Sequence, residues 1–315
     1  MKRRTVYNSL VAFGITVLIF YLLFKAIRPA AVLDTFNRAD LSRVPWLLVP
    51  VLLNMLAPTD KWRRILRALG CKISFSEMLT VMMGCIPLKL VIPGKIGELA
   101  RAFYLSSRKK FLLATGVGVI AFNKVLILMA LCFFVLIGRI LAALSPVWMG
   151  LAGTVLLVVI LWGLDVPFGM LISRSKGESK FGKILQDMGK AFVGLSRCQR
   201  LGYFFYTLFS ESNFVITALL LFWIFHVKVP FPEAVSLAPL AVLIGQLPIG
   251  ISGFGTREAA FLVLFQPWAG SDTLLAVALA YSFVEYILPS IIGLFFMPKF
   301  LTGLPPGTLE EKGVT

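Results

Sequence analysis

The sequence predicts an all-α polytopic membrane protein, with about six full spans and two re-entrant hairpins broken by Pro and Gly. Hydrophobic residues make up 58% of the 315 residues and charged residues only 15%, whereas a soluble domain carries about 25% charged residues. Several apolar runs approach or exceed the ~20 residues that cross a bilayer as a helix. The basic residues also cluster between these runs, as cytoplasmic loops do.

Six uninterrupted apolar runs are the expected spans, and they cover about 8–28, 44–60, 111–137, 147–172, 202–225 and 272–297. The first run follows Met1-Lys2-Arg3-Arg4 but is too long for a signal-peptide core and lacks a clear cleavage site. We therefore expect it to stay as the first helix. Two further runs, 76–106 and 233–265, are interrupted and are the expected hairpins.

The positive-inside rule supports this arrangement. The net charge of +16 would indicate nucleic acid in a soluble protein, but here the charges fit cytoplasmic loops, and no nucleic-acid partner is expected. With the N-terminus and C-terminus in the cytoplasm, 20 of 31 basic residues fall inside and six near the outside. The inside clusters are 2–4, 61–72, 108–110, 174–200 and 299–312.

The chain is expected to form one transmembrane domain, 1–298, followed by a polar tail, 299–315. Between the halves, a basic stretch at about 178–197 has apolar residues at helical spacing. It predicts an amphipathic helix on the cytoplasmic membrane surface, near anionic lipid.

The two interrupted segments resemble each other and indicate an internal repeat. Each begins with Phe-x-Glu, continues for about 15 apolar residues, reaches a Pro/Gly break and ends with Glu near Arg. The offset is 156 residues at the Phe and 160 at the second Glu. Repeat one then covers about 1–137 and repeat two about 147–298. Because the hairpins would enter from opposite sides, the design is that of inverted-repeat transporters.

The breaks predict where a ligand would bind. Non-helical backbone at membrane depth is tolerated only within protein or beside water, and a helix that restarts there offers free N–H groups and a positive dipole end. An anionic head group is the natural occupant. The expected break residues are Pro93, Gly94, Gly97, Pro248, Gly253 and Gly255.

Charged side chains in and beside the hairpins are the candidate substrate-binding residues: Lys89, Lys95, Glu98, Arg101, Lys124, Arg257 and Glu258. Intramembrane charges usually face a cavity or a partner. Glu98 and Arg101 are three residues apart and could pair on one helix face, whereas the adjacent Arg257 and Glu258 point to different faces. Pairing between the hairpins, Arg101 with Glu258 and Glu98 with Arg257, is therefore a hypothesis. The alternative is that these charges only tie the hairpins together.

Other polar residues carry less information. Glu211 and Glu285 each lie in a span and are candidates for lining a polar path. The four cysteines have no metal-ligand spacing, and the single His226 stands at a helix end. No metal, cofactor or catalytic residue is expected.

Two motifs are similar to the signatures of one family: Pro93-x-x-x-Gly97-Glu98-x-x-Arg101 and Gly253-Phe254-Gly255-Thr256-Arg257-Glu258. They resemble the lysylphosphatidylglycerol synthase transmembrane-region family, also described as flippase-like, which includes the membrane half of the multiple peptide resistance factor. Two positions depart from that pattern, because this chain has Asn123-Lys124 where many members carry Glu-Arg, and Ser252-Gly253 where many carry Gly-Gly.

The resemblance implies lipid translocation in a bacterial or archaeal inner membrane, without the synthase activity, and therefore no enzyme. The expected partner is a membrane lipid with an anionic head group, a phospholipid or a polyprenyl-linked lipid, moved by alternating access. A lipid-modifying enzyme is a second candidate partner. The alternatives are an accessory membrane subunit of a lipid or envelope-glycan pathway, a membrane-embedded glycosyltransferase, and a permease for a soluble anion.

Overall fold

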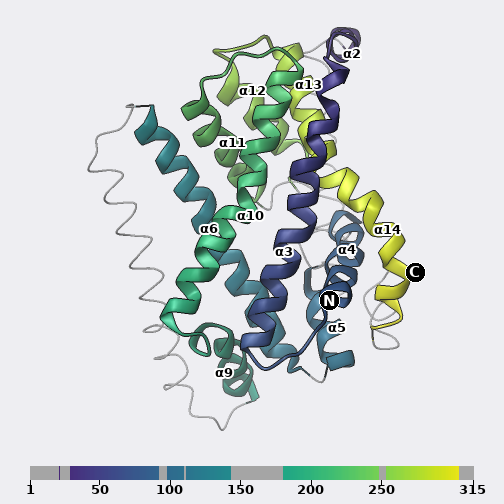
Figure 1. The fold of residues 1–315 in the computed structure, drawn as a ribbon, viewed down its shortest axis with the longest axis vertical. Coiled ribbons are helices and arrows are strands. Elements are labelled where there is room, and N and C mark those ends of the chain that lie inside the picture. Colours follow the sequence, from purple (N-terminus) through teal and green to yellow (C-terminus); the bar gives the residue numbers. More distant parts are fainter. Residues whose placement is uncertain are drawn as a thin grey trace.

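The computed structural model describes residues 21, 29–91, 98–109, 111–142, 180–247 and 253–304. The elements in these parts of the chain are all helical and follow each other as Figure 1 shows. They are α2 (Pro29–Asn37), η1 (Leu41–Leu47), α3 (Leu48–Ala68), α4 (Phe75–Val91), α5 (Leu99–Lys109), α6 (Leu113–Leu141), α9 (Lys180–Val193), α10 (Arg197–Ile224), α11 (Phe231–Gly245), α12 (Thr256–Phe265), α13 (Ser271–Ser282), η3 (Phe283–Ile287) and α14 (Leu288–Leu301).

Four helical stretches are long and apolar enough to cross a membrane, which confirms the helical membrane-protein class. They are Leu41–Ala68, Leu113–Leu141, Arg197–Ile224 and Ser271–Leu301. Each overlaps almost completely with one of the predicted spans. The expected spans at 8–28 and 147–172 lie outside the described residues, so the count of six stays a prediction.

Each interrupted segment consists of two helices on either side of the expected break. The first contains α4 and α5, and the second contains α11 and α12, with residues 92–97 and 248–252 outside the described parts. The two helix pairs lie toward opposite ends of the long axis in Figure 1. Re-entry from opposite sides of a membrane stays a prediction.

Each half of the chain packs one of its helices against a helix of the other half. The first arm of the first interrupted segment, α4, packs against α14, and the first arm of the second, α11, packs against α6. Glycines permit both close approaches, because a Cβ at Gly84 would meet the Phe300 side chain and a Cβ at Gly138 would meet Ser236. This reciprocity is what a two-fold repeat would produce.

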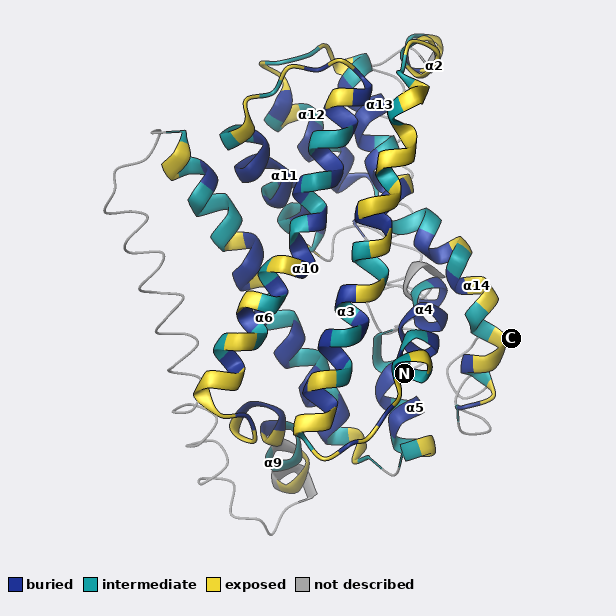
Figure 2. Ribbon diagram, viewed as in Figure 1, coloured by how far each residue is buried: buried dark blue, intermediate teal, exposed yellow. Residues whose placement is uncertain are grey.

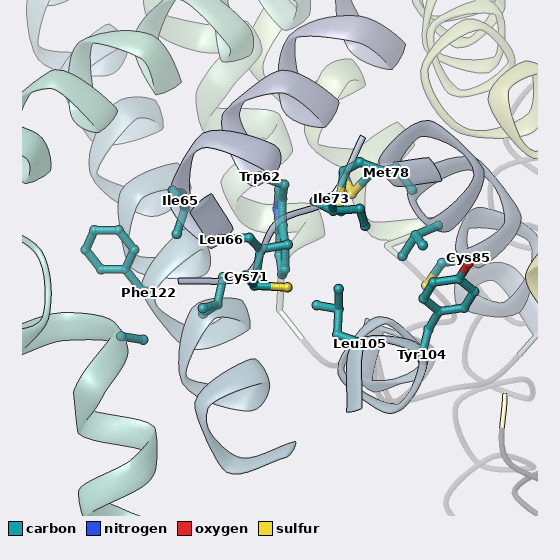
Figure 3. Packing of buried hydrophobic residues seen from close by; sticks show 14 of the residues in the cluster. Trp62, Ile65, Leu66, Cys71, Ile73, Met78, Cys85, Tyr104, Leu105 and Phe122 are labelled. Carbon is teal, nitrogen blue, oxygen red and sulfur yellow. The ribbon is translucent and has the colours of Figure 1, made fainter. Parts of the chain in front are cut away.

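Two hydrophobic clusters stabilise the two ends of the molecule. One joins α3, α4, α5, α6 and α9 around residues such as Trp62, Leu66 and Phe122, as Figure 3 shows. The other joins α10 to α13 around Phe222, Phe261 and similar residues. Between helices in a bilayer, close van der Waals packing of such side chains is a main favourable term, because lipid tails are as apolar as the side chains themselves.

The outer surface is apolar as well. Figure 2 shows exposed residues along α3 and α14, and these include Leu52, at 52% exposed, and Phe295, at 83%. Large apolar residues exposed on long helices are typical of contact with lipid.

The predicted amphipathic stretch 178–197 contains α9, so the helix expected there is present. Ala191, Phe192 and Leu195 are buried in the core, and α9 packs against α6. At least part of its apolar face therefore contacts protein, while its placement at a membrane surface stays a prediction.

The last helix extends past the predicted boundary at 298, because α14 continues to Leu301. Phe300 is fully buried and stacks on Tyr104 at 5.6 Å between ring centroids. The first residues assigned to the polar tail therefore belong to the helical domain, and residues 305–315 lie outside the described parts.

Candidate functional site

A cavity of about 200 Å³, lined by both charged and apolar side chains, lies between the two halves of the chain. Its lining comes from α3, α4, α5, α6, α10, η3 and α14, together with the end of α11. A volume of this size has room for several water molecules. Six charged side chains line it: Lys61, Glu98, Arg101, Lys124, Glu211 and Glu285.

Three of the predicted site residues meet in this cavity. Glu98 lies just before α5, Arg101 in its first turn, and Lys124 in the middle of α6. The Lys124 Nζ lies 3.4 Å from the Glu98 Oε1 and donates a hydrogen bond to it. Lys124 therefore lines the same cavity as Glu98 and Arg101, while its role in substrate binding stays a prediction.

Arg101 differs from the two cavity lysines in its surroundings. Its side chain is 4% exposed, and its guanidinium carbon lies 5.3 Å from the centre of the Trp62 ring. Within the described residues, its buried Nε has no hydrogen-bond partner. A buried guanidinium N–H that lacks a hydrogen-bond acceptor is costly. An acceptor group that entered the cavity could satisfy this side chain and would be bound favourably.

Lys61 is a cavity residue that the sequence analysis assigned to a cytoplasmic basic cluster, and that assignment is wrong. The helix does not end at residue 60, because α3 continues to Ala68, and Lys61 is only 1% exposed. Its Nζ donates to the Thr207 Oγ1 at 3.2 Å and lies 3.8 Å from the Glu211 Oε1.

The spacing of polar residues and proline along α3 could have predicted that Lys61 faces the cavity. Asn54, Pro58 and Lys61 stand at positions i, i+4 and i+7, and all three line the cavity. The two glutamates named as candidates for a polar path, Glu211 and Glu285, also line it, as expected.

The expected pairing between the hairpins is wrong. Arg257 pairs with its sequence neighbour Glu258, with 3.3 Å between Nη2 and Oε1, and Glu98 pairs with Lys124. Neighbours can pair here because the Glu258 side chain folds back toward the helix start, where its Oε2 accepts from the Gly255 N–H at 2.5 Å. Ser282 joins the pair, donating to Glu258 and accepting from Arg257.

Arg257 and Glu258 are almost completely buried, at 2% and 0% exposed, and neither lines the cavity. The Arg257 guanidinium instead lies 3.9 Å from the centre of the Tyr286 ring, and Tyr286 does line the cavity. Arg257 of the second motif therefore contacts a residue that lines the cavity, Tyr286, but does not line the cavity itself.

Glycines shape the described part of the second break. Gly253 and Gly255 have φ values of 81° and 85°, a region that L side chains rarely adopt. A Cβ at Gly253 would also meet the backbone oxygen of Gly245. The turn therefore requires glycine at both positions, as predicted.

The remaining predicted residues lie outside the described parts of the chain. These are Pro93, Gly94, Lys95, Gly97 and Pro248, and the side chain of Lys89 in α4. Their roles stay predictions. In the parts of the chain that the structure covers, no group of three His, Cys, Asp or Glu side chains is arranged to hold a metal ion.

Membrane-length helices around a cavity lined by charged side chains indicate a membrane protein with an internal site for polar groups. The chain belongs to the family described as the lysylphosphatidylglycerol synthase TM region, whose family model matches residues 9–293. The family expected from the two motifs is thus confirmed. A search of curated proteins found no match.

Proposed function

We propose that this protein moves a phosphate-bearing anionic lipid between the leaflets of a cell membrane, with the head group held in the central cavity. The observation that carries the proposal is Arg101, a nearly buried guanidinium that lines the cavity with an unpaired Nε in the described structure. An intramembrane charge of this kind is a functional candidate.

The cavity chemistry favours phosphate over a neutral head group. Arginine offers a planar fork of donors that matches phosphate geometry, and lysine adds point charges. Lys61 and Lys124 each have an acidic neighbour in Glu211 and Glu98. Arg101 is therefore the group to which an added anion would bind first.

The packing of the halves supports alternating access as the mechanism. Helix α4 packs against α14, and α11 packs against α6, so each half of the chain contacts the other through two helix pairs. A rocking motion of one half relative to the other would open the cavity to one side of the membrane at a time. Under the positive-inside rule, the basic clusters favour a cytoplasmic position for both termini. The proposed activity is transport, in which no covalent bond is formed or broken.

A leaflet assay in reconstituted liposomes tests this function. Fluorescent phosphatidylglycerol and fluorescent polyprenyl phosphate would be compared for wild type, Arg101→Gln and the matched control Arg139→Gln. Arg139 pairs with Glu233 away from the cavity, at 3.1 Å. We expect the wild type and the control to move at least one of the two lipids, and Arg101→Gln to lose that movement.

Two results would contradict the proposal. A folded wild type that moves neither lipid would favour an accessory subunit or a carrier of soluble anions, and uptake of inorganic phosphate into the same liposomes would separate those two. If Arg101→Gln moves lipid as fast as the wild type, the head group does not depend on Arg101 in the cavity for transport.

A further inference from the structure

The helix turn at Phe283–Ile287 interrupts the last span with a π-helical segment between α13 and α14. Such turns insert an extra residue into an α-helix and occur frequently at functional sites. Glu285 stands in this turn near the middle of the span Ser271–Leu301, is 4% exposed, and lines the cavity.

Three side chains from two other spans hold the Glu285 carboxyl. The Glu285 Oε2 accepts from the Asn213 Nδ2 at 2.7 Å and from the Asn54 Nδ2 at 3.0 Å, and Thr217 Oγ1 bonds to Oε1. The same Asn54 amide lies 3.2 Å from the Glu285 backbone oxygen. Helices α3 and α10 thus fix one carboxyl group in place.

The chemistry of these partners differs between the two oxygens. An amide nitrogen can only donate, so Oε2 is held as an acceptor, whereas a threonine hydroxyl can donate or accept. Thr217 can therefore donate to an ionised Oε1 or accept from a protonated one. The site is built to hold the carboxyl in either state without moving the backbone.

No lysine or arginine of the described chain lies at ion-pair distance from Glu285. Two cations close to this region have other partners, because Arg257 pairs with Glu258 and Lys61 lies beside Glu211. A carboxylate without a counter-ion at membrane depth is costly. The titratable and charged groups that face Glu285 or share its cavity from the surrounding helices are Lys61, Glu98, Arg101, Lys124, Glu211, Arg257, Tyr281 and Tyr286.

We propose that Glu285 is the proton-binding carboxyl that couples this protein to a proton gradient. A proton from water in the cavity binds to Oε1, the carboxylate becomes a neutral acid, and Thr217 changes from donor to acceptor. The reverse step returns the proton to the water. This inference rests on the proposed lipid transport and supplies its coupling ion.

Proton binding at Glu285 favours anion binding at Arg101, since both side chains line one cavity. Neutralising Glu285 removes a negative charge from the space that the anionic head group enters, so proton and head group stabilise each other there. The coupling is reciprocal, and the bound head group raises the proton affinity of the site.

Infrared difference spectroscopy of the purified protein in lipid tests the proton site without transport. We expect a carboxylic-acid C=O band that titrates in the wild type, disappears in Glu285→Gln, and persists in Glu233→Gln, a partly exposed carboxyl paired outside the cavity. A wild-type spectrum with no titrating band that Glu285→Gln removes would overturn the proposal.

A second variant keeps the test decisive if Glu285→Gln does not fold. Thr217→Val preserves the shape of the side chain and removes the hydroxyl at Oε1. We expect it to shift the pH at which the band titrates, and an unchanged titration would overturn the assignment of the proton to that oxygen.

Transport under an imposed pH gradient separates this proposal from the proposed function. Gradient-dependent lipid movement in the wild type that becomes gradient-insensitive in Glu285→Gln would support both. A titrating Glu285 band in a protein that moves no lipid would support the proton site and contradict lipid transport. If the wild type moves lipid at a rate that does not depend on the pH gradient and shows no titrating carboxylic-acid band, the proton site is contradicted and lipid transport is not.

Discussion

The Arg257 guanidinium lies 3.3 Å from the carboxylate of Glu258, its neighbour in sequence, and Ser282 bonds to both. Both charges are buried, with Tyr286 stacked on the arginine. This arrangement makes the second motif a structural clamp between α12 and the α13–α14 span, beside the cavity that holds Arg101.

Replacing Arg257 with Ala should destabilise the fold strongly. The variant leaves the Glu258 carboxylate buried without its cation, which typically costs ~3–5 kcal/mol. Thermal unfolding in detergent, followed by intrinsic fluorescence, measures the effect. Arg139→Ala is the control, since its pair with Glu233 is partly exposed and should contribute only ~0–1 kcal/mol. Equal stability of the two variants would show that the clamp is not needed.

Lys61 and Glu211 should be coupled energetically, although the two residues lie far apart in sequence. Their charged atoms lie 3.8 Å apart and both side chains are buried. A double-mutant cycle with Lys61→Met and Glu211→Gln should give a coupling free energy of ~0.5–3 kcal/mol, the range for residues in contact. The measurement is unfolding in detergent for the four proteins, and additive effects would contradict the contact.

The close contact between α6 and α11 should not tolerate a side chain at Gly138. A Cβ there would meet Ser236 and the Pro232 backbone oxygen, and overpacking of this kind costs ~1–3 kcal/mol. Gly202 in α10 is the matched control, because nothing lies within 4 Å of its added Cβ. We expect Gly138→Ala to lower the unfolding temperature and Gly202→Ala to raise it slightly, since alanine favours a helix by ~0.5–1 kcal/mol. A neutral Gly138→Ala would indicate that α6 and α11 lie further apart.

The four native cysteines should differ in their reactivity toward maleimides. Cys71 and Cys85 are buried, and burial raises the pKa of the Cys71 thiol, so little reactive thiolate forms at neutral pH. Cys198, exposed at the start of α10, should react with a charged maleimide. Cys132 is exposed on an apolar span and should react only with a membrane-permeant reagent.

Mass spectrometry of labelled vesicles measures these reactivities and also tests the orientation. Cys198 should react with the charged reagent in inside-out vesicles and not in right-side-out ones. Labelling of Cys198 from the outside would reverse the predicted topology, and rapid labelling of Cys71 in the folded protein would contradict its burial.

Local features predicted the helices well. The four membrane-length helical stretches coincide with apolar runs, and the two described glycines of the second break adopt the positive φ values that a tight turn requires. The boundaries were less accurate: α3 and α14 extend past the predicted ends because Trp62, Ile65 and Phe300 are buried against other helices. A hydropathy pattern depends only on neighbouring residues in the sequence, so it does not contain packing partners that are distant in the chain.

The sequence by itself determined the class of protein, the glycine turn at Gly253 and Gly255 and the family, because apolar length, Gly and short motifs act locally. The tertiary structure alone decided which charges meet. It brings Lys61 to Thr207, 146 residues away, and Asn54 to Glu285, 231 residues away, while it pairs Arg257 with the adjacent Glu258. The physical reason is that a buried charge is stabilised by whichever partners the packed helices place around it, and helix spacing along the chain does not specify those partners.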